Sequence, residues 1–399
     1  MVVVVVCGGG NGAHTLAGVA ASRPNTEVRV LTLFADEAER WTKAMESSDF
    51  VTNIHNHDKS ITKLTNKPRL VTKDPGKAAI GAEIIILAVP AFVHAQYLEA
   101  LKPHVTPGTI LVGLPGQPGF EFDVYTIWGP LASKCSIMAF ESLPWACRIA
   151  EFGQCVEILG TKESLVGAVH IGSVPSKFDP TLLLQGCLGP HPSLLTKGHL
   201  LGITLMSVNS YIHSSILYGR WHDWNGTPLD EAPLFYQGID QDTADLMSGM
   251  SDEILVIAKE IMKKNPKVDL HNVDHVLQWY LRVYEDDIQD KSNLYTAIRS
   301  NEAYIGLTHP MSKTEDGKYL PNFKHRYLSE DIPYGLAVSK GVAEVVGVNT
   351  PLIDKVLIWC QEKLGKEYLV DGKMIGKDVT FTRCPQRYSM TTVDAILGK

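Results

Sequence analysis

The opening segment of the chain constrains its fold more than any other. Residues 2–6 are five consecutive valines, and such a run of β-branched residues is typical of a strand buried on both faces of a parallel sheet. A glycine cluster follows and fits the pattern G-x-G-x-x-A at Gly8, Gly10 and Ala13, after which a helical pattern begins. Strand, glycine turn and helix in this order predict the start of a dinucleotide-binding domain of the Rossmann type.

Each small residue of this turn has a physical role. The first glycine permits the tight turn, the second lets a pyrophosphate approach the backbone, and Ala13 lets the helix pack close to the strand. The free N–H groups at the start of the helix favour a phosphate there. The alternative is a glycine-rich loop of an α/β protein that binds no nucleotide. We predict that the cofactor contacts Gly8, Gly9, Gly10, Asn11, Gly12 and Ala13.

Composition and charge exclude several classes of protein. The net charge of −7 argues against a protein that binds polyanions. The sequence also has no cluster of lysines and arginines of the kind that binds nucleic acid. No apolar stretch approaches the roughly 18–20 residues of a membrane span, and the valine run lacks the basic flank of a signal peptide. The seven cysteines are scattered without C-x-x-C spacing, which favours a reduced intracellular protein without a zinc site. We therefore predict a cytoplasmic protein that binds neither nucleic acid nor membrane and holds no metal.

Strand and helix patterns alternate through the first half of the chain. Strands are predicted at 27–33, 83–89, 109–114 and 135–141, with a helix at 36–45 and a hairpin-like insertion at 51–73. Such alternation implies right-handed βαβ crossovers and a doubly wound parallel sheet, whose ligands bind beyond the carboxyl ends of the strands.

The second half of the chain has helical patterns in place of the alternating strands and helices. A run rich in proline and glycine at 172–192 is predicted to end the first domain and to link it to the next. Long helical patterns then follow, at 198–219, 240–264, 272–285, 333–347 and 351–365. The predicted fold is α/β, with an N-terminal Rossmann-type doubly wound parallel sheet and a mainly α-helical C-terminal domain. We place the NAD-binding domain at 1–198 and the helical substrate domain at 199–399.

The end of the second predicted strand bears on the identity of the nucleotide. An acidic residue about 20 residues past the glycine turn normally holds the ribose 2′-hydroxyl of NAD. Here the acids arrive a few residues late, and we assign the ribose contact to Asp36. No arginine stands at the strand end to accept a 2′-phosphate, which favours NADH, although Arg40 one helical turn later keeps NADPH open. The predicted cofactor segment is Phe34, Ala35, Asp36 and Glu37.

Two segments of the second half could carry chemistry. His213 lies in an apolar helical stretch, with Asn209 four residues earlier, and an imidazole in such a place can donate a proton to a carbonyl that is being reduced. The alternative is a histidine with a purely structural role. Further on, Arg326 could clamp a carboxylate or pyrophosphate and Asp331 could orient an imidazolium. The alternative there is a salt bridge of Arg326 with Glu330 at the start of a helix.

With these segments in hand, the chain resembles the opine dehydrogenases, especially the octopine dehydrogenases of invertebrate muscle. The likeness runs over essentially the whole length. It is carried by 7–15 (CGGGNGAHT), 31–41 (LTLFADEAERW), 140–149 (FESLPWACRI), 219–221, 232–240 (APLFYQGID), 326–333 (RYLSEDIP), 366–372 (KEYLVDG) and 383–388 (RCPQRY).

The resemblance implies a reaction and a set of roles. Pyruvate and the amino group of an amino acid form an imine, which NADH reduces to a secondary amine in a cleft between a Rossmann domain and a helical domain. His213 would be the acid/base group and Asp331 its partner, while Arg326 would sense the cofactor pyrophosphate and help to close the domains. The residues implied around the substrates are Gln117 and Ser142 for the keto acid, and Glu141, Cys147 and Trp279 for the amino acid.

The amino acid itself is the least constrained part of the prediction. L-arginine, giving octopine, is the first choice, because Glu141 could accept from a guanidinium and Trp279 could stack on it. Alanopine, strombine or tauropine dehydrogenase are the alternatives. Two departures from the family pattern lie close by: Ser142 replaces a threonine, and Ser214 stands where a proline usually follows the histidine, which would loosen that helix.

Two more distant alternatives stay open. A ketopantoate reductase-like or glycerol-3-phosphate dehydrogenase-like enzyme would rely on a lysine at the reacting centre, and no lysine flanks His213. An NADH-binding regulatory sensor would need the glycine turn and Arg326, but not His213 together with Asp331. The resemblance also implies a monomer, as is common among the invertebrate enzymes.

Overall fold

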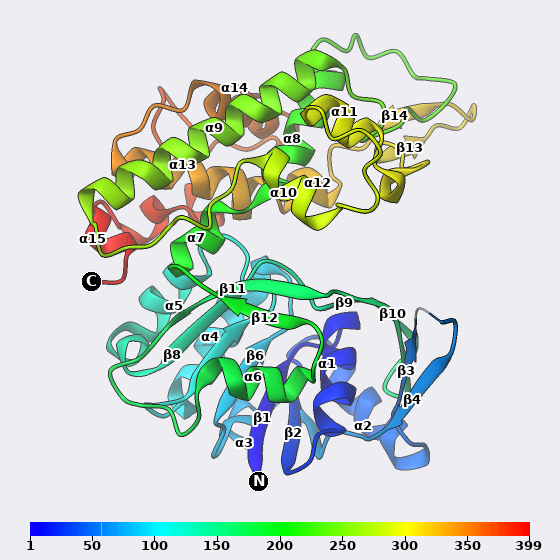
Figure 1. Ribbon diagram of the computed structural model, residues 1–399, viewed down its shortest axis with the longest axis vertical. Helices are drawn as coiled ribbons and strands as arrows, with labels where there is room; N and C mark the ends of the chain where they lie inside the picture. Colours follow the sequence, from blue (N-terminus) through cyan, green and yellow to red (C-terminus); the bar gives the residue numbers. More distant parts are fainter. Residues whose placement is uncertain (57) are drawn as a thin grey trace. The chain divides into compact units, whose positions relative to one another are not determined.

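The chain divides into two compact units. The computed structural model describes residues 1–56 and 58–399, and the units are Met1–Ile203 with Gly398, and Thr204–Leu397 with Lys399 (Figure 1). The sequence-based division after residue 198 falls between β12 (Ser193–Thr196) and α7 (Leu200–Leu205).

The first unit is built on an eight-stranded sheet in the order β12-β11-β8-β7-β6-β1-β2-β5. From β5 to β8 all strands are parallel, and their order is that of the doubly wound dinucleotide-binding fold. Strand β11 then runs antiparallel to β8, and β12 pairs parallel with β11. The predicted fold class is confirmed. The bounds are β1 Val2–Cys7, β2 Thr26–Leu31, β5 Leu70–Thr72, β6 Ile84–Leu87, β7 Ile110–Gly113, β8 Ser136–Phe140 and β11 Ser164–His170.

The valine run forms the central strand because both faces of the sheet are covered. Val4 and Val6 pack into one apolar cluster with α1 (Asn11–Ala21) and α6 (Pro180–Leu188). Val5 and Cys7 point the other way, into a second cluster with α4 (His94–Leu101) and α5 (Phe120–Trp128). Side chains alternate along a strand, so a strand between two helical layers needs apolar residues at every position. Two further helices, α2 (Glu37–Ser47) and α3 (Pro75–Ala79), complete the crossovers (Figure 1).

The insertion predicted at 51–73 is a hairpin that belongs to a second sheet. Strands β3 (Val51–His55) and β4 (Ile61–Thr65) pair antiparallel. They join β10 (Cys155–Thr161) and β9 (Trp145–Glu151) in the order β4-β3-β10-β9. This small sheet packs against α1.

The prediction of a linker at 172–192 was wrong. Helix α6 occupies the middle of it, with Pro180 in its first turn, the Asp179 carboxylate capping it, and Gly189 ending it at φ +99°. Proline is common in the first turn of a helix and glycine just past its end. Pro180 and Gly189, which suggest a loop in the sequence, therefore mark the two ends of a helix. The helix contacts α1, and β12 then extends the main sheet.

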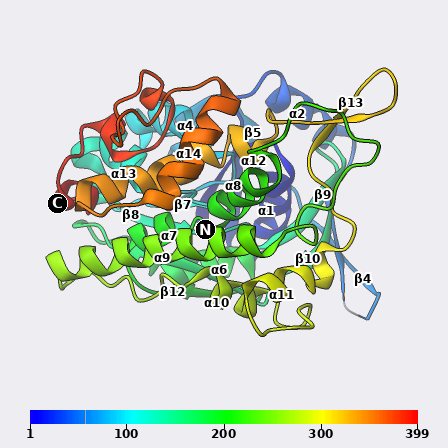
Figure 2. The same cartoon turned by 90° about the horizontal axis from the view of Figure 1, so that it is seen from above.

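The second unit is mainly helical, as predicted. Its core is α8, which contacts α9, α12 and α14; Figures 1 and 2 show the long α9 beside α8 and α13. A short hairpin of β13 (Met311–Lys313) and β14 (Tyr319–Pro321) completes it. The helices are α8 Val208–Trp221, α9 Gln241–Lys264, α10 Val276–Val283, α11 Leu294–Arg299, α12 Arg326–Ser329, α13 Ala337–Val346, α14 Pro351–Leu364 and α15 Val393–Ile396, with a π-helical turn at Ile332–Leu336.

One stretch departs from the expectation that nothing approaches membrane length. Leu200–Trp221 is long and apolar enough, by length and composition alone, to cross a membrane. Of the apolar window within it, 89% is buried inside the protein, and it comprises α7 and α8. The core helices of soluble proteins pass the same test, so the stretch is weak evidence for a membrane span.

Candidate active site

The glycine turn has the geometry that a dinucleotide site requires. Gly8 has φ +121°, and a Cβ there would lie 2.7 Å from Cγ1 of Val89, so the turn admits only glycine. Gly10 faces open space, with no atom within 4 Å of where its Cβ would be. It stands at the N-cap of α1 without a side chain that caps the free N–H groups. A phosphate can therefore approach the positive end of this helix.

Two side chains that follow the glycines hold the turn in place. The Asn11 side-chain oxygen accepts the N–H of Ile149 on β9 at 2.9 Å. His14 accepts the N–H of Gly153 at Nε2, which leaves its other nitrogen to donate to the Gly10 carbonyl at 3.2 Å. The ring stacks on Trp41 at 3.6 Å, and burial lowers the pKa of His14 to about 3. Asn11 and the neutral His14 thus support the turn from the protein side.

The two acids after β2 lie in different places. Asp36 pairs with Arg40 at 2.9 Å, and both side chains are exposed. The Glu37 carboxylate accepts the hydroxyl of Thr32 at 2.5 Å, and a Cβ added at Gly9 would collide with it. Glu37 therefore lies against the glycine turn. The chain bends through Ala35 at φ +37°, and after this bend the Glu37 side chain lies next to Gly9.

Three predicted substrate residues follow the carboxyl ends of neighbouring strands. Gln117 comes after β7 and has φ +61°, an uncommon left-handed conformation for a residue other than glycine. The N–H of Gly116 donates to the Phe140 carbonyl at 2.9 Å, so this loop lies next to Glu141 and Ser142 at the end of β8. The Ser142 hydroxyl accepts a hydrogen bond from the ammonium of Lys162, a residue that no sequence motif marked.

The other two predicted amino-acid contacts lie in different settings. Cys147 is buried on β9 within the apolar core, where burial raises the pKa of its thiol while Thr15 of α1 hydrogen-bonds to it. Trp279 lies on α10, and its ring packs against Tyr280 at 5.2 Å and Tyr284 at 5.9 Å. The side chain of Cys147 thus packs inside the first unit, whereas Trp279 belongs to an aromatic cluster of the second.

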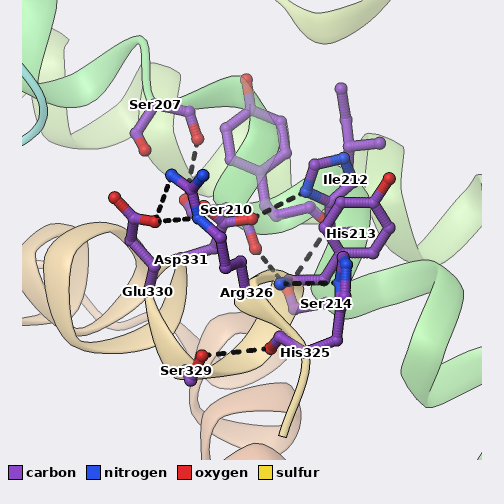
Figure 3. A network of polar contacts seen from close by, with 12 residues as sticks. Ser207, Ser210, Ile212, His213, Ser214, His325, Arg326, Ser329, Glu330 and Asp331 are labelled. Atoms are coloured by element: carbon purple, nitrogen blue, oxygen red, sulfur yellow. Dashed lines mark hydrogen bonds and ion pairs between the residues drawn. The ribbon is translucent and has the colours of Figure 1, made fainter. Parts of the chain in front are cut away.

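His213 and Asp331 form a buried pair in the second unit. His213 lies in the middle of α8 and is 7% exposed, and its Nδ1 is 2.7 Å from a carboxylate oxygen of Asp331 (Figure 3). Because a carboxylate only accepts, Nδ1 carries a proton and the tautomer is fixed. Such a pair can hold and release a proton at the other nitrogen, Nε2.

The backbone around Asp331 is unusual. The N–H of Asp331 donates to the Arg326 carbonyl at 3.2 Å, and the N–H of Leu336 donates to the Asp331 carbonyl at 3.0 Å. Both bonds span five residues, which is the spacing of a π-helix, and such turns occur frequently at functional sites. The wider turn places Asp331 beside α8.

Helix α8 runs without interruption past His213. The hydroxyl of Ser214 donates to the Ser210 carbonyl at 2.6 Å, and Ser214 is completely buried. Serine keeps the backbone N–H that proline lacks, so the expected loosening of the helix was wrong. Asn209 is exposed, whereas His213 is buried.

Arg326 forms the ion pair that the sequence analysis gave as the alternative to a cofactor role. Its guanidinium lies 2.5 Å from a carboxylate oxygen of Glu330, while its side chain stays 70% exposed (Figure 3). Next to it, burial and then the nearby charges of His213 and Arg326 lower the pKa of His325. The Arg326 guanidinium is thus paired with Glu330 on one side and exposed to solvent on the other.

Aromatic residues surround His213, and the sequence analysis assigned no role to them. The ring of Tyr327 stacks on the imidazole at 3.8 Å, and the Tyr236 hydroxyl is 2.9 Å from Nε2. Both residues lie in segments quoted for the resemblance, 232–240 and 326–333, which was the signal that could have found them. Within residues 1–56 and 58–399, no group of three or more histidine, cysteine or acidic side chains could hold a metal.

Comparisons with known proteins fit this geometry. The family model described as "NAD/NADP octopine/nopaline dehydrogenase, alpha-helical domain" matches residues 196–364. A tauropine dehydrogenase from Arabella iricolor is 57% identical over 397 residues, which cover 100% of both chains. The chain belongs to the opine dehydrogenase family. An octopine dehydrogenase from Pecten maximus is 52% identical over 394 residues, 99% of this chain and 98% of the relative.

The fold is also similar to that of a solved structure from the same family. Octopine dehydrogenase with NADH and L-arginine has a TM-score of 0.97 and 51% identity, covering 100% of this chain and 98% of the other. This opine dehydrogenase is therefore an NAD-dependent oxidoreductase of the kind that acts on CH–NH groups, with small molecules as its substrates. The predicted family, fold and enzyme class are confirmed.

Proposed function

We propose that this protein catalyses the NADH-dependent reductive condensation of pyruvate with the amino group of an amino acid. The observation that carries the proposal is the buried pair of His213 and Asp331, held at 2.7 Å between α8 and the π-helical turn. Condensation of a keto acid with an amine expels the carbonyl oxygen as water, and that oxygen must first be protonated. In its protonated form, an imidazole whose Nδ1 is fixed by a carboxylate supplies this proton from Nε2.

The glycine turn fits NADH, which supplies the hydride when it is bound. Gly10 leaves room for the pyrophosphate at the start of α1, and the Glu37 carboxylate lies where a ribose hydroxyl could donate to it. The same carboxylate would repel a 2′-phosphate, which favours NADH over NADPH. Asp36 and the exposed side of Arg326 complete the proposed contacts, the latter to the pyrophosphate.

We assign the keto acid to the carboxyl ends of β7 and β8. Gln117 offers an amide and Ser142 a hydroxyl. The Lys162 ammonium at Ser142 adds a positive charge that favours the carboxylate of pyruvate.

Different observations favour two amino acids. Glu141 is an acceptor beside the Gln117 loop, and Trp279 is an aromatic wall, as the guanidinium of L-arginine would require. Taurine is favoured by the 57% identity to a tauropine dehydrogenase, which exceeds the 52% to the octopine enzyme. L-arginine remains the first candidate and taurine the second. We further propose that the enzyme acts in the cytoplasm as a monomer, consistent with seven cysteines that are all free.

A panel of amino acids tests this function. The oxidation of NADH is followed with pyruvate plus L-arginine, taurine, alanine, glycine or β-alanine, and with pyruvate alone. We expect rapid oxidation with one amino acid of the panel and slow oxidation with pyruvate alone, because the reducible imine requires both partners. Faster turnover with taurine than with L-arginine would overturn the first candidate but leave the reaction standing. Equal rates with and without every amino acid would overturn the reaction.

A further inference from the structure

Both ring nitrogens of His213 have protein partners. Nδ1 is 2.7 Å from Asp331, and Nε2 is 2.9 Å from the hydroxyl of Tyr236. The ring of Tyr327 covers one face of the imidazole at 3.8 Å with an interplanar angle of 21°. The imidazole of His213 is thus held by a hydrogen bond at each ring nitrogen and by a stacked aromatic ring on one face.

A hydroxyl suits the Nε2 position because it can both donate and accept. In the neutral ring the Nδ1 proton points to Asp331, so Nε2 accepts the proton of the Tyr236 hydroxyl. When the ring is protonated, Nε2–H donates to the same oxygen. A carboxylate at this place could only accept and an ammonium could only donate. Tyr236 can therefore hydrogen-bond to Nε2 in both protonation states of the free enzyme, and the substrate oxygen takes the place of its hydroxyl when the proton is transferred.

The surroundings of Tyr236 keep its hydroxyl neutral. The side chain is nearly buried, at 7% exposure, and its ring stacks on Tyr304 at 3.8 Å. Burial raises the pKa of Tyr236 well above its ordinary value. The nearby Tyr327 raises this pKa further. Tyr236 therefore keeps its proton and presents a neutral hydroxyl to Nε2.

We propose that Tyr236 is a positioning residue, which holds the imidazole of His213 so that the proton it transfers lies at Nε2. It fixes the orientation of the imidazole together with Asp331 and offers a partner to Nε2 in either protonation state. This inference rests on the acid/base role of His213 proposed above. The ionisable groups that face His213 are Asp331, Tyr236, Tyr327 and His325.

The test replaces Tyr236 by phenylalanine and uses Tyr304→Phe as the matched control. Tyr304 loses the same hydroxyl one ring farther from His213, in the same aromatic stack. We expect Tyr236→Phe to lower kcat about tenfold, which corresponds to about 1.4 kcal/mol. A hydrogen bond to a charged imidazolium is stronger than one to the neutral ring, so the limb of the pH profile that reports the protonated form should move to lower pH. Tyr304→Phe should leave both properties near those of the unaltered enzyme.

A second measurement observes the hydrogen bonds of His213 in the unaltered enzyme. Nitrogen-15 NMR of the unaltered enzyme, with the His213 signals assigned by their loss in His213→Ala, should show a proton on Nδ1 and a hydrogen-bonded Nε2. A free Nε2, or a kcat and pH profile of Tyr236→Phe that match those of Tyr304→Phe, would overturn the inference. If His213→Ala itself keeps its turnover, the acid/base role fails instead, whatever Tyr236 does.

Discussion

At the scale of single residues, two adjacent acids after β2 differ in what they can do. Asp36 is exposed and paired with Arg40, whereas Glu37 lies against the glycine turn. We predict that Glu37→Gln raises the ratio of kcat/KM for NADPH to that for NADH about tenfold, because a negative charge near the 2′-phosphate is removed. Asp36→Asn, as the control, should change the ratio less. Steady-state kinetics with both cofactors measures this, and a larger effect of Asp36→Asn would return the ribose contact to that residue.

Several site residues could be predicted from the sequence, because their neighbours in the chain carry the signal. The glycine turn follows its strand directly, His213 lies in an apolar helical stretch, and Asp331 lies in the segment 326–333 that carries the resemblance. Their pairing is a prediction that the 2.7 Å contact supports. The contact of the Tyr236 hydroxyl with Nε2 was not predicted, because it depends on how the segment that follows α8 folds back onto this helix.

At the scale of elements, apolar periodicity in the sequence predicts whether a segment is a helix or a strand, but it does not predict every helix or the π-helical turn. The helices of the second unit follow their apolar periodicity, and the valine run is the central strand. Helix α6 was missed because Pro180 and Gly189 were taken for loop residues. The π-helical turn at Asp331 has no distinct sequence pattern, since it differs from an α-helix only in which carbonyl each N–H reaches.

One element-level prediction concerns His14, which ties α1 to the turn at Gly153. Burial lowers its pKa to about 3, from about 6.5 in the unfolded chain. The unfolded state therefore binds more protons between these values, and stability is lost as the pH falls below about 6.5. At pH 5 the loss from His14 is about 2 kcal/mol relative to neutral pH.

Denaturant titration at pH 7 and pH 5 checks this contribution. His309 is also buried, with its pKa lowered to about 3, so the unaltered protein should lose stability from both histidines. His14→Gln keeps a donor and an acceptor but no titrating ring, and it should show a smaller loss between the two pH values. The same loss in both proteins would mean that His14 does not titrate on unfolding.

At the scale of the whole molecule, the chain combines a doubly wound sheet with a helical unit, and each carries part of the proposed chemistry. The glycine turn and the strand ends of the first unit offer sites for the cofactor and the keto acid. The second unit holds the acid/base pair. We predict a monomer, which sedimentation equilibrium checks: a mass near 43.9 kDa is expected, and twice that value would contradict it.

The most direct test of the account is the turnover of His213→Ala. The control is His222→Ala, which removes an exposed histidine at the end of the same helix. NADH oxidation is measured with pyruvate and the preferred amino acid, and NADH binding is measured by fluorescence. The account predicts a loss of kcat on the order of 10²–10⁴ for His213→Ala with NADH binding nearly intact, because an acid/base group is removed while the glycine turn is untouched. Near-normal turnover of His213→Ala would contradict it.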